Sequence, residues 1–175
     1  MNKIIFRTNG GLGKQIMSTA VAKAIKEKYK KSILHVQTSY PEAYNNLEYV
    51  DRFFGGNVPY FYTDHIDFDV LETEIYVDLK YRQGKEHAIE TWCRKLNLPK
   101  PKEIRGYIEL DSQELSIADT ILMKNKIDAN KLIAFQPFGS VSYYNPQVAQ
   151  DPSRLNTNKN LPVRVAQELV NKLVE

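Results

Sequence analysis

Cysteine and long apolar runs are what this sequence has least of. Its 175 residues include one cysteine, Cys93, so no disulfide can form within the chain. No segment approaches the ~18 consecutive apolar residues that a membrane-spanning helix needs. We do not expect an apolar leader either, because a strand pattern begins almost directly after Met1. We therefore predict a cytoplasmic chain without a membrane span, in which Cys93 is a small buried side chain.

Charge of one sign is also scarce. The formal net charge is +3, and the densest basic stretch is KEKYKK at residues 26–31. Proteins that bind nucleic acid specifically carry a basic patch or stripe, so we do not predict nucleic acid as a partner. With 42% apolar and 26% charged residues, the composition is that of a globular protein.

The N-terminal part shows the clearest pattern of secondary structure. Residues 3–8 predict a buried strand, residues 15–29 an amphipathic helix, and residues 33–38 a second strand. A strand, a glycine turn, a helix and a strand in this order form a right-handed βαβ unit with parallel strands. The sequence therefore predicts an α/β fold with a Rossmann-like parallel sheet and helices on both faces.

The remaining elements are predicted from shorter patterns. Strands are expected at residues 58–62, 75–79, 107–110 and 132–136. Helices are expected at residues 87–96 and at residues 161–175. A further helix is expected to begin at a capping box formed by Asp111 and Glu114. We predict a first domain at residues 1–128 and the start of a second α/β unit at residues 129–175, truncated before its partner strands.

The glycine turn after the first strand is the main candidate binding site. Gly10, Gly11 and Gly13 remove side chains where a ligand would approach the backbone. The following helix presents unpaired N–H groups that suit an anion such as phosphate. Lys14 would add a positive charge at an exposed position of this turn. We predict that the turn binds phosphate through these residues and the flanking Asn9 and Gln15; a tight turn without a ligand is the alternative.

Two well-known phosphate motifs do not fit this turn. A P-loop would need glycine at Thr8 and serine or threonine at Gln15. The dinucleotide fingerprint would need glycine at Ile16 and a carboxylate after the second strand, where Gln37 and Thr38 stand. Neither ATP hydrolysis nor NAD binding is predicted.

Two stretches resemble heptosyltransferase-like (family 9) glycosyltransferases. They are TNGGLGKQIMSTAVAKAIKEKYK at residues 8–30, and LIAFQPFGS followed by KNLP at residues 132–162. The turn is most similar to that of glycosyltransferases from phages and environmental bacteria that begin with GG-[IL]-GK, and an α-1,2-fucosyltransferase opens with a similar GGLGNQ turn. The family has a GT-B architecture, in which two Rossmann-like domains hold the acceptor and the nucleotide-sugar donor. The resemblance implies transfer of a sugar from a nucleotide-sugar to a glycan or other hydroxyl acceptor, in the host cytoplasm if the chain is phage-encoded.

The resemblance also implies site residues. Ser140 and Lys159 match positions that approach the donor diphosphate, whose charge grows in the transition state. The family carries an aspartate, the base that deprotonates the acceptor, where this chain has Lys14. Asp64 and Asp67 are the nearest replacement carboxylates, and no metal or other cofactor is implied beyond the nucleotide-sugar as co-substrate.

Two other functions stay open at this point. Lys14 in place of the aspartate favours a non-catalytic module that binds a phosphate or a sugar. The unfinished second unit favours a structural protein that pairs its exposed strand with another copy, because open strand edges invite such pairing.

Overall fold

Strands and helices alternate along the first part of the chain, as the sequence predicts. The computed structural model describes residues 2–55, 65–134 and 163–174. They belong to two units, Met1–Ala118 and Asp119–Glu175, which we describe separately. The predicted domain boundary at residues 128 and 129 stays a prediction.

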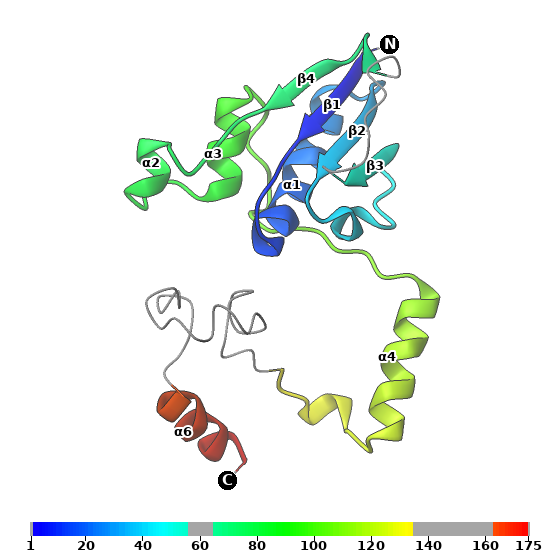
Figure 1. The fold of residues 1–175 in the computed structure, drawn as a ribbon, viewed down its shortest axis with the longest axis vertical. Coiled ribbons are helices and arrows are strands. Elements are labelled where there is room, and N and C mark those ends of the chain that lie inside the picture. The colour runs from blue at the N-terminus through cyan, green and yellow to red at the C-terminus, as the bar shows by residue number, and fades with distance from the viewer. Residues whose placement is uncertain (1, 56–64, 135–162, 175) are drawn as a thin grey trace, which may run out of the picture. The chain divides into compact units, whose positions relative to one another are not determined.

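The first unit contains a parallel sheet of four strands (Figure 1). The strands are β1 (Lys3–Arg7), β2 (Ile33–Thr38), β3 (Arg52–Gly55) and β4 (Asp69–Glu72), in the spatial order β3-β2-β1-β4. All three neighbouring pairs are parallel. The predicted α/β class and Rossmann-like parallel sheet are confirmed.

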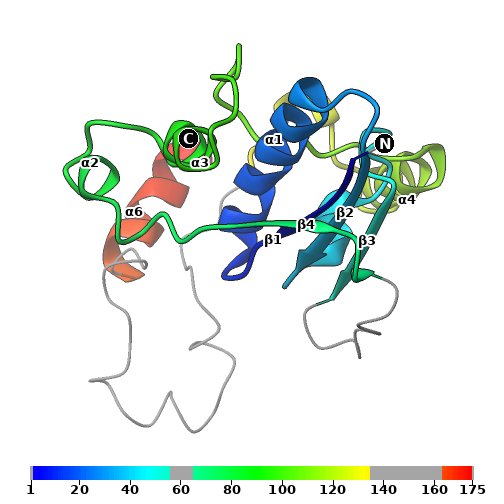
Figure 2. The same cartoon turned by 90° about the horizontal axis from the view of Figure 1, so that it is seen from above.

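Helix α1 (Leu12–Lys28) covers one face of this sheet (Figure 2). Register places Phe6 beside Val36 on this face, and both side chains are fully buried. The helix begins directly after Gly11, earlier than the sequence predicts, and carries lysines in its last turn, where cations favour the negative end of the helix dipole. A 3-10 turn, η1 (Pro41–Tyr44), follows β2.

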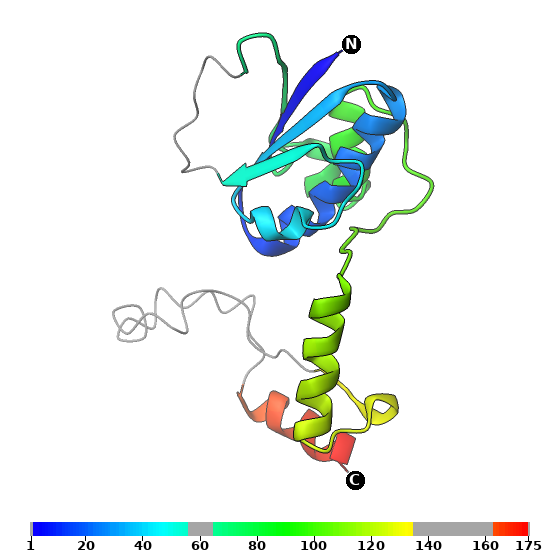
Figure 3. The ribbon, with the colours of Figure 1, turned by 90° about the vertical axis from the view of Figure 1, so that its right-hand side faces the viewer.

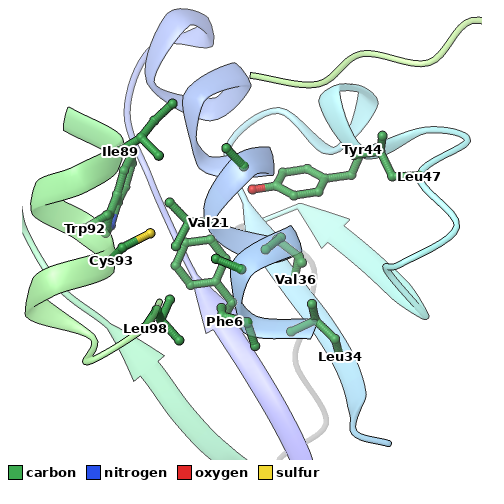
Figure 4. Close-up of a cluster of buried hydrophobic side chains, with 14 of the residues drawn as sticks. Phe6, Val21, Leu34, Val36, Tyr44, Leu47, Ile89, Trp92, Cys93 and Leu98 are labelled. Atoms are coloured by element: carbon green, nitrogen blue, oxygen red, sulfur yellow. The ribbon is translucent and has the colours of Figure 1, made fainter. Parts of the chain in front are cut away.

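The core is completed by α3 (Ala88–Lys95), which packs against α1 (Figure 4). Trp92 is fully buried, and its ring meets that of Phe6 edge-on at 6.3 Å. Cys93 is buried beside it, as predicted, and burial raises the pKa of its thiol to about 11. Truncating a buried tryptophan to alanine typically costs about 3–5 kcal/mol, so this contact is a main source of stability.

Several predicted strands are wrong. The fourth strand is β4 and not residues 75–79, which form a turn and the start of α2 (Leu79–Arg82). Residues 107–110 pair with no described strand, and the Tyr107 N–H donates instead to the Thr19 hydroxyl of α1 at 2.7 Å. Residues 132–134 are not a strand, and the predicted strand at residues 58–62 lies outside the described residues.

The helices of the C-terminal part agree with the sequence. Helix α4 (Ser112–Lys124) is uninterrupted (Figure 3), and the predicted capping box closes its first turn through reciprocal Asp111 and Glu114 bonds of 2.8 and 2.9 Å. A 3-10 turn, η3 (Ala129–Lys131), and α6 (Val163–Val174) follow. Within the described residues no helix is both long and apolar enough to cross a membrane.

Candidate functional site at the carboxyl edge of the sheet

The strand order defines the place where a ligand is expected. From β1 the chain proceeds outward to β2 and β3, and then returns to place β4 on the other side of β1. In open α/β sheets, ligands bind outside the carboxyl ends of the strands at such a reversal. The glycine turn leaves β1 at this point, so the predicted site lies at the reversal.

The turn has the open backbone that the sequence predicts. Gly10 has a φ of +113°, a conformation that L side chains rarely adopt, and its N–H donates to the Ser39 hydroxyl at 3.2 Å. A Cβ added at Gly11 or Gly13 would meet nothing within 4 Å, so the space beside both residues is open. No side chain caps the start of α1, which leaves N–H groups of its first turn without a side-chain partner.

Lys14 does not lie at the surface, and the prediction of an exposed position is wrong. Its side chain is 4% exposed, and its ammonium group lies 3.0 and 3.3 Å from the two carboxylate oxygens of Glu74. The same ammonium lies 4.8 Å from the ring centre of Tyr76 and 5.6 Å from that of Trp92. The lysine stem runs inward past Gly10, where an added Cβ would lie 3.0 Å from Lys14 Cδ. Phosphate binding by Lys14 stays a prediction, but its charge is already neutralised within the protein.

Glu74 is held in its charged form. Partial burial raises the pKa of its carboxyl, but hydrogen bonds from the Tyr76 N–H and from Lys14 outweigh this effect and lower the pKa below its ordinary value. The carboxylate is 45% exposed, so one side of the ion pair remains in contact with solvent. Glu74 therefore joins the segment after β4 to the first turn of α1.

A polar pocket of about 320 Å³ lies at the carboxyl ends of β1, β2 and β4. Its lining consists of charged, amide and hydroxyl side chains: Arg7, Thr8, Asn9, Gln37, Thr38, Ser39 and Glu72. Arg7 and Glu72 approach to 4.0 Å across neighbouring strands, so the lining of the pocket includes one positively and one negatively charged side chain. The predicted residue Asn9 is part of it.

The Thr8 hydroxyl and the Gln15 amide nitrogen are buried at this edge and have no hydrogen-bond partner among the described residues. Thr8 is 9% exposed and lines the pocket. The predicted residue Gln15 is fully buried, and its amide oxygen accepts a 2.7 Å bond from the Thr38 hydroxyl. Buried polar groups are normally paired, so an unpaired hydroxyl in a pocket indicates that a water or a ligand completes it.

The other predicted site residues are not gathered here. Asp67 lies before β4, at the amino edge of the sheet, where it forms an exposed 3.4 Å ion pair with Lys3. The five residues of β1 alone span about 13 Å, so Asp67 lies at the opposite edge of the sheet from the glycine turn, and a catalytic role of Asp67 stays a prediction. Asp64, Ser140 and Lys159 lie outside the described residues.

Sequence reasoning missed the carboxylates that do reach this edge. Glu72 and Glu74 lie at the end of β4 and just after it, in a stretch that was not recognised as a strand. Interpreting DVLE as a short parallel strand would have placed both near the glycine turn. No group of three or more potential metal ligands occurs among residues 2–55, 65–134 and 163–174.

The fold and the site define a class: an α/β chain whose Rossmann-like sheet carries a polar pocket and a bare glycine turn at its carboxyl edge. Comparisons with models of protein families, with curated proteins and with solved structures gave no match. The glycosyltransferase family, the nucleotide-sugar and glycan partners, a homo-oligomer and a cytoplasmic location therefore stay predictions.

Proposed function

We propose that the first unit is the acceptor-side half of a GT-B glycosyltransferase, which transfers a sugar from a nucleotide-sugar to a hydroxyl of a glycan or other acceptor. The observation that carries this proposal is the polar pocket beside the glycine turn at the strand reversal. A sheet of this kind serves many functions, so the fold alone does not define the reaction. The type of reaction is therefore proposed from the resemblance of residues 8–30 and 132–162.

The composition of the pocket supports a hydroxyl-rich ligand. Sugar hydroxyls donate and accept hydrogen bonds at once, and this lining offers both kinds of partner. The Arg7 guanidinium only donates, the Glu72 carboxylate only accepts, and the Asn9 amide does both. The opposite charges of Arg7 and Glu72 suit an uncharged acceptor ring.

Glu72 is the base in this proposal. Its side chain is 57% exposed at the pocket, whereas Glu74 is bound to Lys14. The Glu72 carboxylate takes the proton of the acceptor hydroxyl while that oxygen bonds to the anomeric carbon of the donor. The bond between this carbon and the diphosphate breaks, and its electron pair leaves with the nucleoside diphosphate.

Glu72→Gln tests this role, with Asp67→Asn as the matched control at the other edge of the sheet. General bases contribute about 10²–10⁴-fold, so Glu72→Gln should lower sugar transfer by at least about 100-fold. The control should keep transfer within about twofold, because it removes only an exposed ion pair. Transfer from ADP- and GDP-sugars to a panel of oligosaccharides is the assay, with calorimetry to report binding. Equal transfer by the two variants would refute the role of Glu72.

The buried Lys14 favours one alternative, a non-catalytic sugar-binding module. The family places its base where this chain holds an ammonium group bound to Glu74. In that case calorimetry would detect saccharide binding that Thr8→Val and Ser39→Ala weaken, while no donor is consumed. No binding of any saccharide or nucleotide-sugar would contradict both functions.

A further inference from the structure

Two histidines meet on the face of the sheet opposite α1. His35 belongs to β2, and His65 begins the turn that leads into β4. Nδ1 of His35 lies 2.8 Å from Nε2 of His65, which is a hydrogen-bond distance. One nitrogen must donate and the other accept, so at least one of these two rings is neutral while the bond exists.

Aromatic rings enclose this pair. The ring centre of Phe68 lies 4.7 Å from those of both histidines, and Phe54 of β3 lies 5.5 Å from His65. His65 is only 8% exposed, and its carbonyl accepts a 3.0 Å bond from the Phe68 N–H. The bond between the two imidazoles therefore connects the turn at residues 65–68 to the sheet beside two phenylalanine rings.

The charged groups around the pair disfavour a second proton. Burial lowers the pKa of His35, and His65 and Arg52 of β3 lower it further, while Asp51 raises it. Asp51 is already bound to Lys26 at 2.6 Å and to the Leu34 N–H at 2.8 Å.

Lys3 and Asp67 are two further charged residues near the pair, and they are joined to each other. Lys3 of β1 lies 5.9 Å from the ring centre of Phe68, and it forms an ion pair with Asp67 of the turn. Asp51 and Asp67 are thus each engaged by a lysine.

We propose that the His35–His65 pair is a pH-sensitive latch, which holds the turn at residues 65–68 on the sheet near neutral pH and releases it in mildly acidic solution. When both rings are protonated, every ring nitrogen is a donor, so the 2.8 Å bond is lost and two like charges face each other. The latch does not depend on the proposed sugar transfer.

The direction of the pH dependence follows from the His35 pKa. The folded protein holds this pKa below the 6.5 of an unperturbed histidine, so the unfolded state binds the proton more readily. The stabilisation is complete above about pH 6.5 and decreases as the pH falls toward the folded pKa.

Hydrogen exchange of the Phe68 amide tests the latch in the full chain. The chain has three histidines, and the third, His87, caps α3 outside this cluster. The protection factor of the Phe68 amide, which corrects for intrinsic exchange, should fall at least tenfold between about pH 7.5 and 5.5. The same fall is expected in the control His87→Asn, which keeps a capping side chain. The double variant His35→Phe, His65→Phe keeps two rings without titratable nitrogens, and its protection should change less than twofold.

A second measurement needs no variant. Cross-peaks between the ring protons of His35 and Phe68 should be present in NMR spectra at pH 7.5 and lost at pH 5.5. Cross-peaks that persist after both histidines have titrated, or an unchanged protection factor in the natural sequence, would overturn the proposal. Equal loss of protection in the double phenylalanine variant would also overturn it.

Discussion

The two ends of β1 carry the same kind of ion pair in different surroundings. At the amino edge, Lys3 and Asp67 lie 3.4 Å apart, with side chains 41% and 71% exposed. At the carboxyl edge, Lys14 and Glu74 lie 3.0 Å apart, but the lysine is only 4% exposed. The distances are similar, so the difference between the pairs is the burial of one ammonium group.

The difference in burial determines how much each ion pair contributes to stability. Water screens the exposed pair, and such pairs contribute about 0–1 kcal/mol. The buried lysine also lies in the first turn of α1, where the helix dipole disfavours a cation. Glu74 and the rings of Tyr76 and Trp92 replace the lost hydration, so the glycine turn and the segment after β4 are fixed together. A lysine beside a glycine turn is therefore not by itself a phosphate ligand.

The largest effect is expected when the buried pair loses its anion. Glu74→Gln leaves the Lys14 ammonium buried against a neutral amide, and breaking a buried pair costs about 3–5 kcal/mol. Because Glu74 is half exposed, we expect a loss of about 2–3 kcal/mol in the free energy of unfolding. Urea denaturation measures this loss, with Asp67→Asn as the matched control. Equal midpoints for the two variants would contradict the buried pair.

A smaller effect is expected on the pH dependence of stability. The pKa of Glu74 is lower in the folded protein than the ordinary 4.5, so its stabilisation is present above about pH 4.5 and decreases as the pH falls through the folded value. Lys14→Met removes the main charge that favours the carboxylate, so its stability should fall less steeply below pH 4.5. Parallel curves of unfolding free energy against pH for the variant and the natural sequence would argue against this coupling.

The smallest effect is expected at the amino edge. Lys3→Ala and Asp67→Asn should each change the free energy of unfolding by less than about 0.5 kcal/mol, because the charged groups of this pair are accessible to water. Adding salt to about 1 M should remove even this difference. A loss above 1 kcal/mol in denaturation experiments would mean that the difference in exposure does not determine how much each ion pair contributes to stability.

The sequence predicts the parts of this fold that have strong local patterns. The first βαβ unit and α3 follow from apolar spacing and from the glycine turn, and the capping box marks the start of α4. The short strands β3 and β4 were missed, because four residues carry too little periodicity to distinguish a strand from a loop. Their identity depends on pairing with β1 and β2, which only the folded chain provides.

The candidate site was also only partly predictable from the sequence. The position of the glycine turn was predictable, since a turn between a parallel strand and a helix lies at the carboxyl edge of the sheet. The burial of Lys14 was not, because its partner Glu74 is 60 residues away and belongs to the missed segment. The position of Asp67 at the amino edge was not predictable either, because β4 was not recognised as a strand.

A double-mutant cycle on Lys14→Met and Glu74→Gln tests the buried pair most directly. Residues in direct contact show coupling of about 0.5–3 kcal/mol, and we expect at least about 1.5 kcal/mol here. The parallel cycle on Lys3→Ala and Asp67→Asn should give less than about 0.5 kcal/mol. Couplings of equal size at the two edges, measured by urea denaturation at pH 7, would contradict the account.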